Sequence, residues 1–118
     1  MFELSVQSSF SAAHQVIGYP GDCAGLHGHT YRVEVRIRIA DLDKLGMALD
    51  FRKIQNCLNE TLKNLDHKNL NELPFFKKYN TTAEWIAIYI YKRIKEEIEG
   101  LYSVTVWEGN DYSVTYYK

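Results

Sequence analysis

The chain has 118 residues, 46% of them hydrophobic and 14% aromatic, with 14 basic and 15 acidic side chains. This apolar content exceeds that of disordered chains, and a formal net charge of −1 offers no basic surface for a nucleic-acid backbone. We therefore expect one globular domain over residues 1–118 that does not bind nucleic acid.

The sequence also argues against a membrane or secreted protein. Its longest apolar run, residues 85–91, is far shorter than the about 20 residues that a membrane helix needs. The N-terminus lacks the basic start and apolar stretch of a secretory signal, so a cytoplasmic location is expected. In that compartment Cys23 and Cys57 are expected to be thiols rather than a disulfide.

Two segments near the N-terminus alternate with a period of two, which predicts strands from Phe2 to His14 and from His27 to Ile39. The second segment places polar residues on its other face. Glycines and a proline between the two segments predict a turn-rich connection.

The middle of the chain changes to a helical period. Asp50 is placed to cap a first helix, while a capping box running from Thr81 to Glu84 opens a second helix that Gly100 would end. The two apolar stripes are Phe51, Ile54, Leu58, Leu62 and Leu65, and Ala83, Ala87, Ile90, Ile94 and Ile98.

The last 18 residues return to alternation on either side of Gly109-Asn110-Asp111, which predicts a hairpin. The order strand, strand, helix, helix, strand, strand predicts an α+β fold, a four-stranded antiparallel sheet with two helices on its apolar face. Such a sheet has two exposed edges, and nine tyrosines suit pairing between subunits, so we expect a ring-like oligomer.

Three histidines stand at the ends of the first two predicted strands. His27 and His29 are two residues apart and so leave the same face, and His14 continues the buried phase of the first strand. If the strands pair, the three imidazoles converge. Such a set favours zinc with one open position, as in catalytic sites; alternatively, each histidine merely packs or faces solvent.

The two cysteines have different predicted roles. Cys23, four residues before His27, is either a fourth metal ligand or a thiolate acting as base or nucleophile. Position alone does not choose between these roles. Cys57 lies beside the apolar stripe of the first helix and is interpreted as a small core residue.

Two acidic positions also bear on chemistry. Asp66 directly precedes His67, and a carboxylate beside an imidazole is the pair found in proton relays. Alternatively, Asp66 caps Asn69 in a turn at the helix end. Glu108 ends a buried phase, so it either accepts hydrogen bonds from an amidine-like ring edge or points into water at the strand end.

The motifs, taken in order, resemble those of the 6-pyruvoyltetrahydropterin and 6-carboxytetrahydropterin synthase family. The matching segments cover nearly the whole chain and are Phe10-Ser-Ala-Ala-His14, Cys23-Ala-Gly-Leu-His27-Gly-His29, Leu49-Asp50-Phe51, Leu65-Asp66-His67-Lys-Asn-Leu70-Asn71, Thr82-Ala83-Glu84 and Trp107-Glu108. The resemblance implies a T-fold, a zinc ion and an oligomer, usually a homohexamer built as a dimer of trimers. In it the sheets join into barrels and the active sites form between subunits.

The resemblance also implies roles for individual residues. His14, His27 and His29 would be the zinc ligands, and Cys23 the catalytic base. Asp66 and His67 would be relay partners presented from a neighbouring subunit, and Glu108 would anchor the pterin ring. Thr81, Thr82 and Glu84 would lie near the pocket for the pterin ring, although their role in helix capping is by itself sufficient to explain these residue types.

Within this family two activities share the substrate 7,8-dihydroneopterin triphosphate. One branch loses triphosphate to give 6-pyruvoyltetrahydropterin, and the other also releases acetaldehyde to give 6-carboxytetrahydropterin for queuosine and other deazapurines. Three residues separate Cys23 from His27, which resembles the carboxy branch, so that activity is predicted. The alternatives are the pyruvoyl activity and a non-catalytic, zinc-stabilised pterin-binding module.

Overall fold

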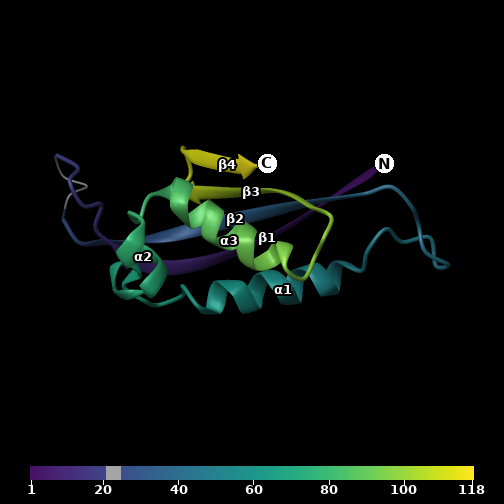
Figure 1. The fold of residues 1–118 in the computed structure, drawn as a ribbon, viewed down its shortest axis with the longest axis horizontal. Coiled ribbons are helices and arrows are strands. Elements are labelled where there is room, and N and C mark those ends of the chain that lie inside the picture. Colours follow the sequence, from purple (N-terminus) through teal and green to yellow (C-terminus); the bar gives the residue numbers. More distant parts are fainter. Residues whose placement is uncertain (21–24) are drawn as a thin grey trace.

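The computed structural model describes residues 1–20 and 25–118, which form a four-stranded antiparallel sheet with helices along one face (Figure 1). The strands, in spatial order, are β1 (Phe2–His14), β2 (His27–Ile39), β3 (Leu101–Glu108) and β4 (Ser113–Tyr117). The helices are α1 (Phe51–Lys63), η2 (Leu70–Glu72, a 3₁₀ turn), α2 (Pro74–Lys78) and α3 (Ala83–Lys95). The α+β prediction is confirmed, whereas η2 and α2 were not predicted.

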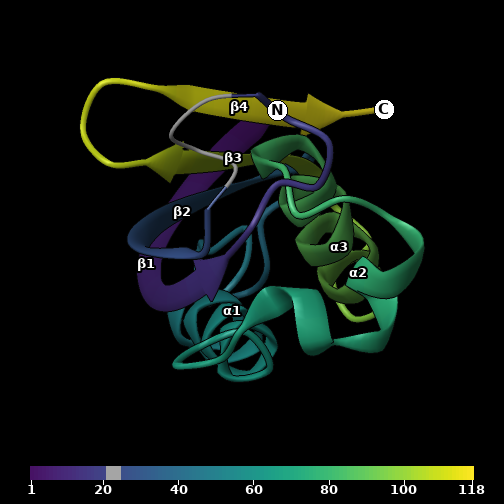
Figure 2. The same cartoon turned by 90° about the vertical axis from the view of Figure 1, so that its left-hand side faces the viewer.

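One face of the sheet forms the core with α1 and α3, which lie on the same side of it (Figure 2). The period-two residues of the strands meet the helical stripes there, as the sequence predicts. Phe51, the first residue of α1, is an exception and is 61% exposed. The fully buried residues at this interface include Val33, Val35, Ile37, Ile54, Leu58, Ile86, Ile90, Ile94, Val104 and Val106.

The second long helix begins and ends differently from the prediction. Thr82, not Thr81, is the N-cap of α3, and its hydroxyl accepts a hydrogen bond from the Trp85 backbone N–H. The helix ends at Lys95, well before Gly100. Gly100 instead permits a close approach, because a Cβ there would lie 2.8 Å from the Arg38 carbonyl oxygen.

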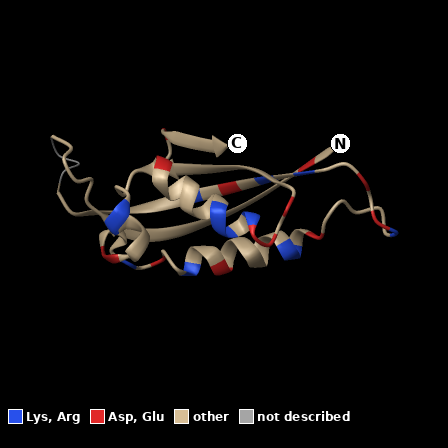
Figure 3. Cartoon of the chain, viewed as in Figure 1, with Lys and Arg blue, Asp and Glu red and all other residues tan. Residues whose placement is uncertain are grey.

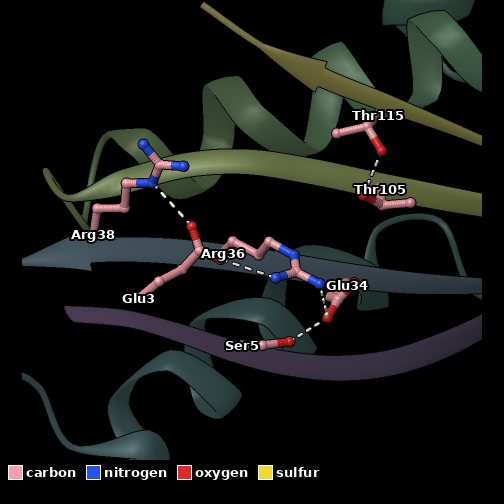
Figure 4. A network of polar contacts seen from close by, with 7 residues as sticks. All are labelled: Glu3, Ser5, Glu34, Arg36, Arg38, Thr105 and Thr115. Carbon is pink, nitrogen blue, oxygen red and sulfur yellow. Dashed lines mark hydrogen bonds and ion pairs between the residues drawn. The ribbon is translucent and has the colours of Figure 1, made fainter.

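The other face of the sheet is polar, as predicted for β2. Its side chains form a network in which Glu3 pairs with Arg36 and Arg38 at 2.9 Å, and Ser5 donates a hydrogen bond to Glu34 (Figure 4). Charged residues of both signs are also dispersed over the helices and loops, without a block of one sign (Figure 3).

In the described part of the chain, no helix combines the length and apolarity that a bilayer span requires.

Candidate active site

Three imidazoles converge where β1 and β2 meet at one end of the sheet. His14 is the register partner of His27, and His29 lies two residues further along the same face of β2. Their candidate ligand nitrogens all lie within 4.8 Å of one another, and the ring centroids are 4.5–5.2 Å apart. The predicted convergence is therefore present.

Backbone carbonyls orient two of these rings. His14 Nδ1 lies 2.7 Å from the Thr81 carbonyl oxygen, and His27 Nδ1 lies 2.7 Å from that of Gly25. Because a carbonyl only accepts, each Nδ1 carries the proton and each Nε2 keeps its lone pair. The Nε2 atom of His14 is buried without a hydrogen-bond partner among residues 1–20 and 25–118.

Burial also favours the neutral form of two of the three histidines. It lowers the pKa of both His14 and His29, with the hydrogen bond to Thr81 opposing the change at His14. A neutral imidazole is the form that binds a metal ion, so protonation competes less with metal binding at neutral pH. A buried, unpartnered nitrogen among two more imidazoles fits a zinc site.

Thr81 is fully buried at this end of the sheet, and its hydroxyl donates to the Gln15 carbonyl at 3.0 Å. That bond ties the segment before α3 to the end of β1 and holds the Thr81 carbonyl against His14. Thr81 therefore lies beside the three histidines, a contact that its sequence motif did not indicate.

A small cavity of about 190 Å³ lies between the start of α3 and the last strands. Glu108 lines it from the end of β3 and is half-buried, while Glu84 lines it from the first turn of α3. The negative charge of Glu108 acts to raise the pKa values of both His14 and His29, which places this carboxylate near the histidines. The cavity and the three imidazoles thus form neighbouring parts of one site. The other lining residues are Ala83, Val106, Tyr112, Ser113 and Val114.

Tyr31 lies next to the histidines, and the sequence motifs did not indicate it as a candidate site residue. It is fully buried two residues after His29, and its hydroxyl has no hydrogen-bond partner in the described part of the chain. In register it lies between Phe10 on β1 and Glu108 on β3. The period-two pattern correctly assigns the ring to the buried face, but the pattern carries no information about the hydroxyl.

Asp66 and His67 form a contact of 2.9 Å on the segment that runs beside β1. One Asp66 oxygen accepts the Ser11 backbone N–H, and this bond together with His67 holds the pKa of Asp66 below its usual range. Among the described residues Asp66 does not cap Asn69, because its two oxygens contact the Ser11 N–H and His67 Nδ1 instead, while Asn69 caps η2. His67 has a positive φ of 58° and an 83% exposed side chain.

The two cysteines differ in what the structure describes. Cys23 falls outside the described residues. Cys57 is buried in α1 as predicted, and burial raises the pKa of its thiol to about 11. Such a thiol remains protonated at neutral pH, consistent with a packing role.

The chain belongs to the 6-pyruvoyl tetrahydropterin synthase family, whose family model matches residues 3–118. It is 36% identical to a dihydroneopterin monophosphate aldolase from Pyrococcus furiosus, over 92% of this chain and 90% of that protein. It is 32% identical to a 6-carboxy-5,6,7,8-tetrahydropterin synthase from Haemophilus influenzae, over 92% and 93% of the two chains.

Solved structures agree with this assignment. The fold matches that of the 6-pyruvoyl tetrahydropterin synthase of Caenorhabditis elegans with a TM-score of 0.89 and 30% identity, over 99% of this chain and 95% of that one. The T-fold predicted from the motifs is therefore confirmed. The family is one of enzymes that act on pterins, and its named members carry out more than one reaction.

Proposed function

We propose that this chain is a zinc-dependent 6-carboxytetrahydropterin synthase. It would convert 7,8-dihydroneopterin triphosphate to 6-carboxytetrahydropterin with release of triphosphate and acetaldehyde, on the route to queuosine. The observation that carries the proposal is the convergence of three imidazoles beside a cavity lined by Glu108. A ligand bound to that carboxylate would extend its side chain toward the histidines.

His14, His27 and His29 are the proposed zinc ligands. The orphaned Nε2 of His14 and the carbonyl-bound Nδ1 atoms of His14 and His27 support this assignment. Zinc bound there would polarise the hydroxyl oxygens of the substrate side chain and leave one position for substrate.

The other proposed roles follow the family motifs. Glu108 accepts hydrogen bonds from the pyrimidine edge of the pterin and so holds its side chain in register. Cys23 removes the proton from the side-chain carbon next to the polarised oxygen. The Asp66–His67 pair, contributed by a neighbouring subunit, relays protons, and its 2.9 Å contact supports the relay.

The residues at the start of α3 are proposed to surround the ring. Glu84 shares the cavity with Glu108, which supports a position near bound pterin. Thr82 caps the helix and Thr81 supports His14, so these two would shape the pocket mainly through the backbone.

A product assay separates the carboxy activity from the pyruvoyl one. With dihydroneopterin triphosphate, we expect one acetaldehyde for each triphosphate released, measured by coupled reduction of the aldehyde and by chromatography of the pterin. Triphosphate without acetaldehyde would assign the chain to the pyruvoyl branch. The three-residue spacing between Cys23 and His27 supports the carboxy branch.

The Pyrococcus relative makes an aldolase the second candidate, since it is 36% identical to this chain. Cleavage of the carbon–carbon bond in the side chain of dihydroneopterin monophosphate would release a two-carbon aldehyde that retains the phosphate. Incubation with the monophosphate and analysis for that phosphorylated aldehyde tests this activity directly.

A non-catalytic binding module is the third possibility, in which Cys23 closes the zinc site. The variant Cys23→Ala distinguishes it from an enzyme. We expect the variant to retain zinc and lose turnover, because a base is removed but the ligands remain. Loss of zinc and of thermal stability would instead favour the closed site.

A further inference from the structure

Tyr31 breaks a rule that almost all buried polar groups obey. A buried hydroxyl normally has a hydrogen-bond partner, because an unmade bond in the interior costs free energy. Within residues 1–20 and 25–118, two buried side-chain atoms lack one: His14 Nε2 and the Tyr31 hydroxyl. Both lie at the end of the sheet that carries the three histidines, and a metal ion bound there would account only for the first.

The position of Tyr31 points to the ligand that would engage it. Residues opposite each other on antiparallel strands direct their side chains to the same face, so Tyr31 shares the helix-covered face with its partner Glu108. On the other side its ring lies 5.4 Å from that of His29 and 5.8 Å from that of His14. Tyr31 therefore lies between the cavity carboxylate and the metal-binding histidines.

The ring of Tyr31 is fixed while its neighbour Glu108 is not. Phe10 stacks on the tyrosine ring at 4.8 Å and 13°, and the residue has no exposed surface. A tyrosine hydroxyl can donate a hydrogen bond, and none of the described residues accepts one from Tyr31. Glu108 is half-buried and makes no side-chain hydrogen bond within the described residues, so its carboxylate is available to accept hydrogen bonds from a ligand.

We infer that the Tyr31 hydroxyl is a ligand-binding group that donates a hydrogen bond to the bound pterin, between its Glu108 edge and its metal-facing side chain. This inference rests on the proposed function, because it requires a pterin at Glu108. The heterocycle offers ring nitrogens and a carbonyl oxygen as acceptors, which suits a neutral donor held in a fixed position.

The test uses the isosteric variant Tyr31→Phe in the zinc-loaded protein, with neopterin as the probe in a calorimetric or fluorescence titration. We expect the Kd for neopterin to rise about five- to twenty-fold. The zinc content should stay unchanged, and the melting temperature should stay unchanged or rise. The matched control is Tyr91→Phe, which removes a hydroxyl from a buried tyrosine on α3 that packs against Tyr116. The control should bind as the parent does.

Four other outcomes overturn the inference. A Tyr31→Phe variant that binds neopterin as tightly as the parent would show that the hydroxyl makes no hydrogen bond to the ligand, and that it is either bound to an internal water or unpaired. Loss of zinc from this variant would make Tyr31 part of the metal site instead. If the parent itself fails to bind neopterin, or if Glu108→Ala binds it equally well, the proposed pterin site fails as well.

Discussion

The three histidines show how individual residues acquire a role from their neighbours. His14 is 1% exposed, yet one of its nitrogens bonds to a carbonyl while the other faces two further imidazoles. A buried polar atom left without a partner is unfavourable, so the arrangement makes sense when an ion occupies the point of convergence.

Replacing His14 by alanine should therefore abolish zinc binding. We expect purified parent protein to hold about one zinc per chain, and His14→Ala to hold less than about a tenth of that, measured by plasma mass spectrometry. His67→Ala is the control, since its exposed side chain lies outside the convergent set. Zinc loss in the control, or retention in His14→Ala, would contradict the ligand assignment.

Asp66 should contribute stability that depends on pH. Its pKa is lowered in the folded chain, so the contribution is present above the unfolded pKa near 4 and disappears as pH falls through the lower folded value. We expect Asp66→Asn to lower the urea midpoint at pH 7, and the difference from the parent to shrink toward pH 2–3. An equal difference at both pH values would mean that the carboxylate charge does not matter.

At the scale of elements, close packing of the backbone limits what side chains the connections tolerate. The segment from Asp66 to Asn69 runs along β1 and forms two backbone–backbone bonds with it, from His67 N–H to Ser11 and from Ala13 N–H to Lys68. This segment holds the Asp66–His67 pair against the end of the sheet that carries His14. At the opposite end, the Gly100 carbonyl accepts the Arg38 N–H and draws the α3–β3 connection onto β2.

Gly100→Ala should consequently be destabilising. The added methyl group would lie 2.8 Å from the Arg38 carbonyl oxygen, and relieving that clash moves backbone, at a cost of about 1–3 kcal/mol of unfolding free energy in urea. Gly28→Ala is the matched control, because its new methyl group would meet its nearest atom, the Ala12 carbonyl oxygen, at 3.8 Å. Equal stability of the two variants would refute the packing argument.

At the scale of the whole molecule, the sheet has unpaired edges. The strand order β1-β2-β3-β4 leaves β1 and β4 outermost. Within residues 1–20 and 25–118, the edge of β1 is bridged near Ala13 by Asn69, and the nearby Ser11 carbonyl accepts the His67 N–H. Open edges allow pairing with another chain, so the sheet of this elongated molecule, whose extents are 53 × 24 × 22 Å, is suited to joining further copies side by side. We propose an oligomer on this ground. The homohexamer with active sites between subunits is the assembly that the family resemblance implies, and we propose it for this chain.

Light scattering after gel filtration tests the assembly. We expect a mass of about six times the 13.8 kDa of one chain, and turnover per chain that falls when dilution dissociates it, since residues from two subunits would complete each site. Full activity of a monomer would exclude a shared site.

Much of this architecture was predictable from local patterns. All four strands follow from alternation, and the α1 cap at Asp50 follows from a residue type that accepts a backbone hydrogen bond. The short helices η2 and α2 were missed because three- and five-residue helices contain too few positions to show a period, although Asn69 and Pro74 mark their starts.

The sequence by itself determined which residues face the core and that three histidines share one face, because side-chain direction in a strand depends only on position along it. Only the tertiary structure decided that Thr82 caps α3, that Thr81 fixes the His14 tautomer and that Tyr31 lies between Glu108 and the histidines. Those relations join segments distant in the chain. They depend on strand register and helix placement, which arise from packing of the whole domain.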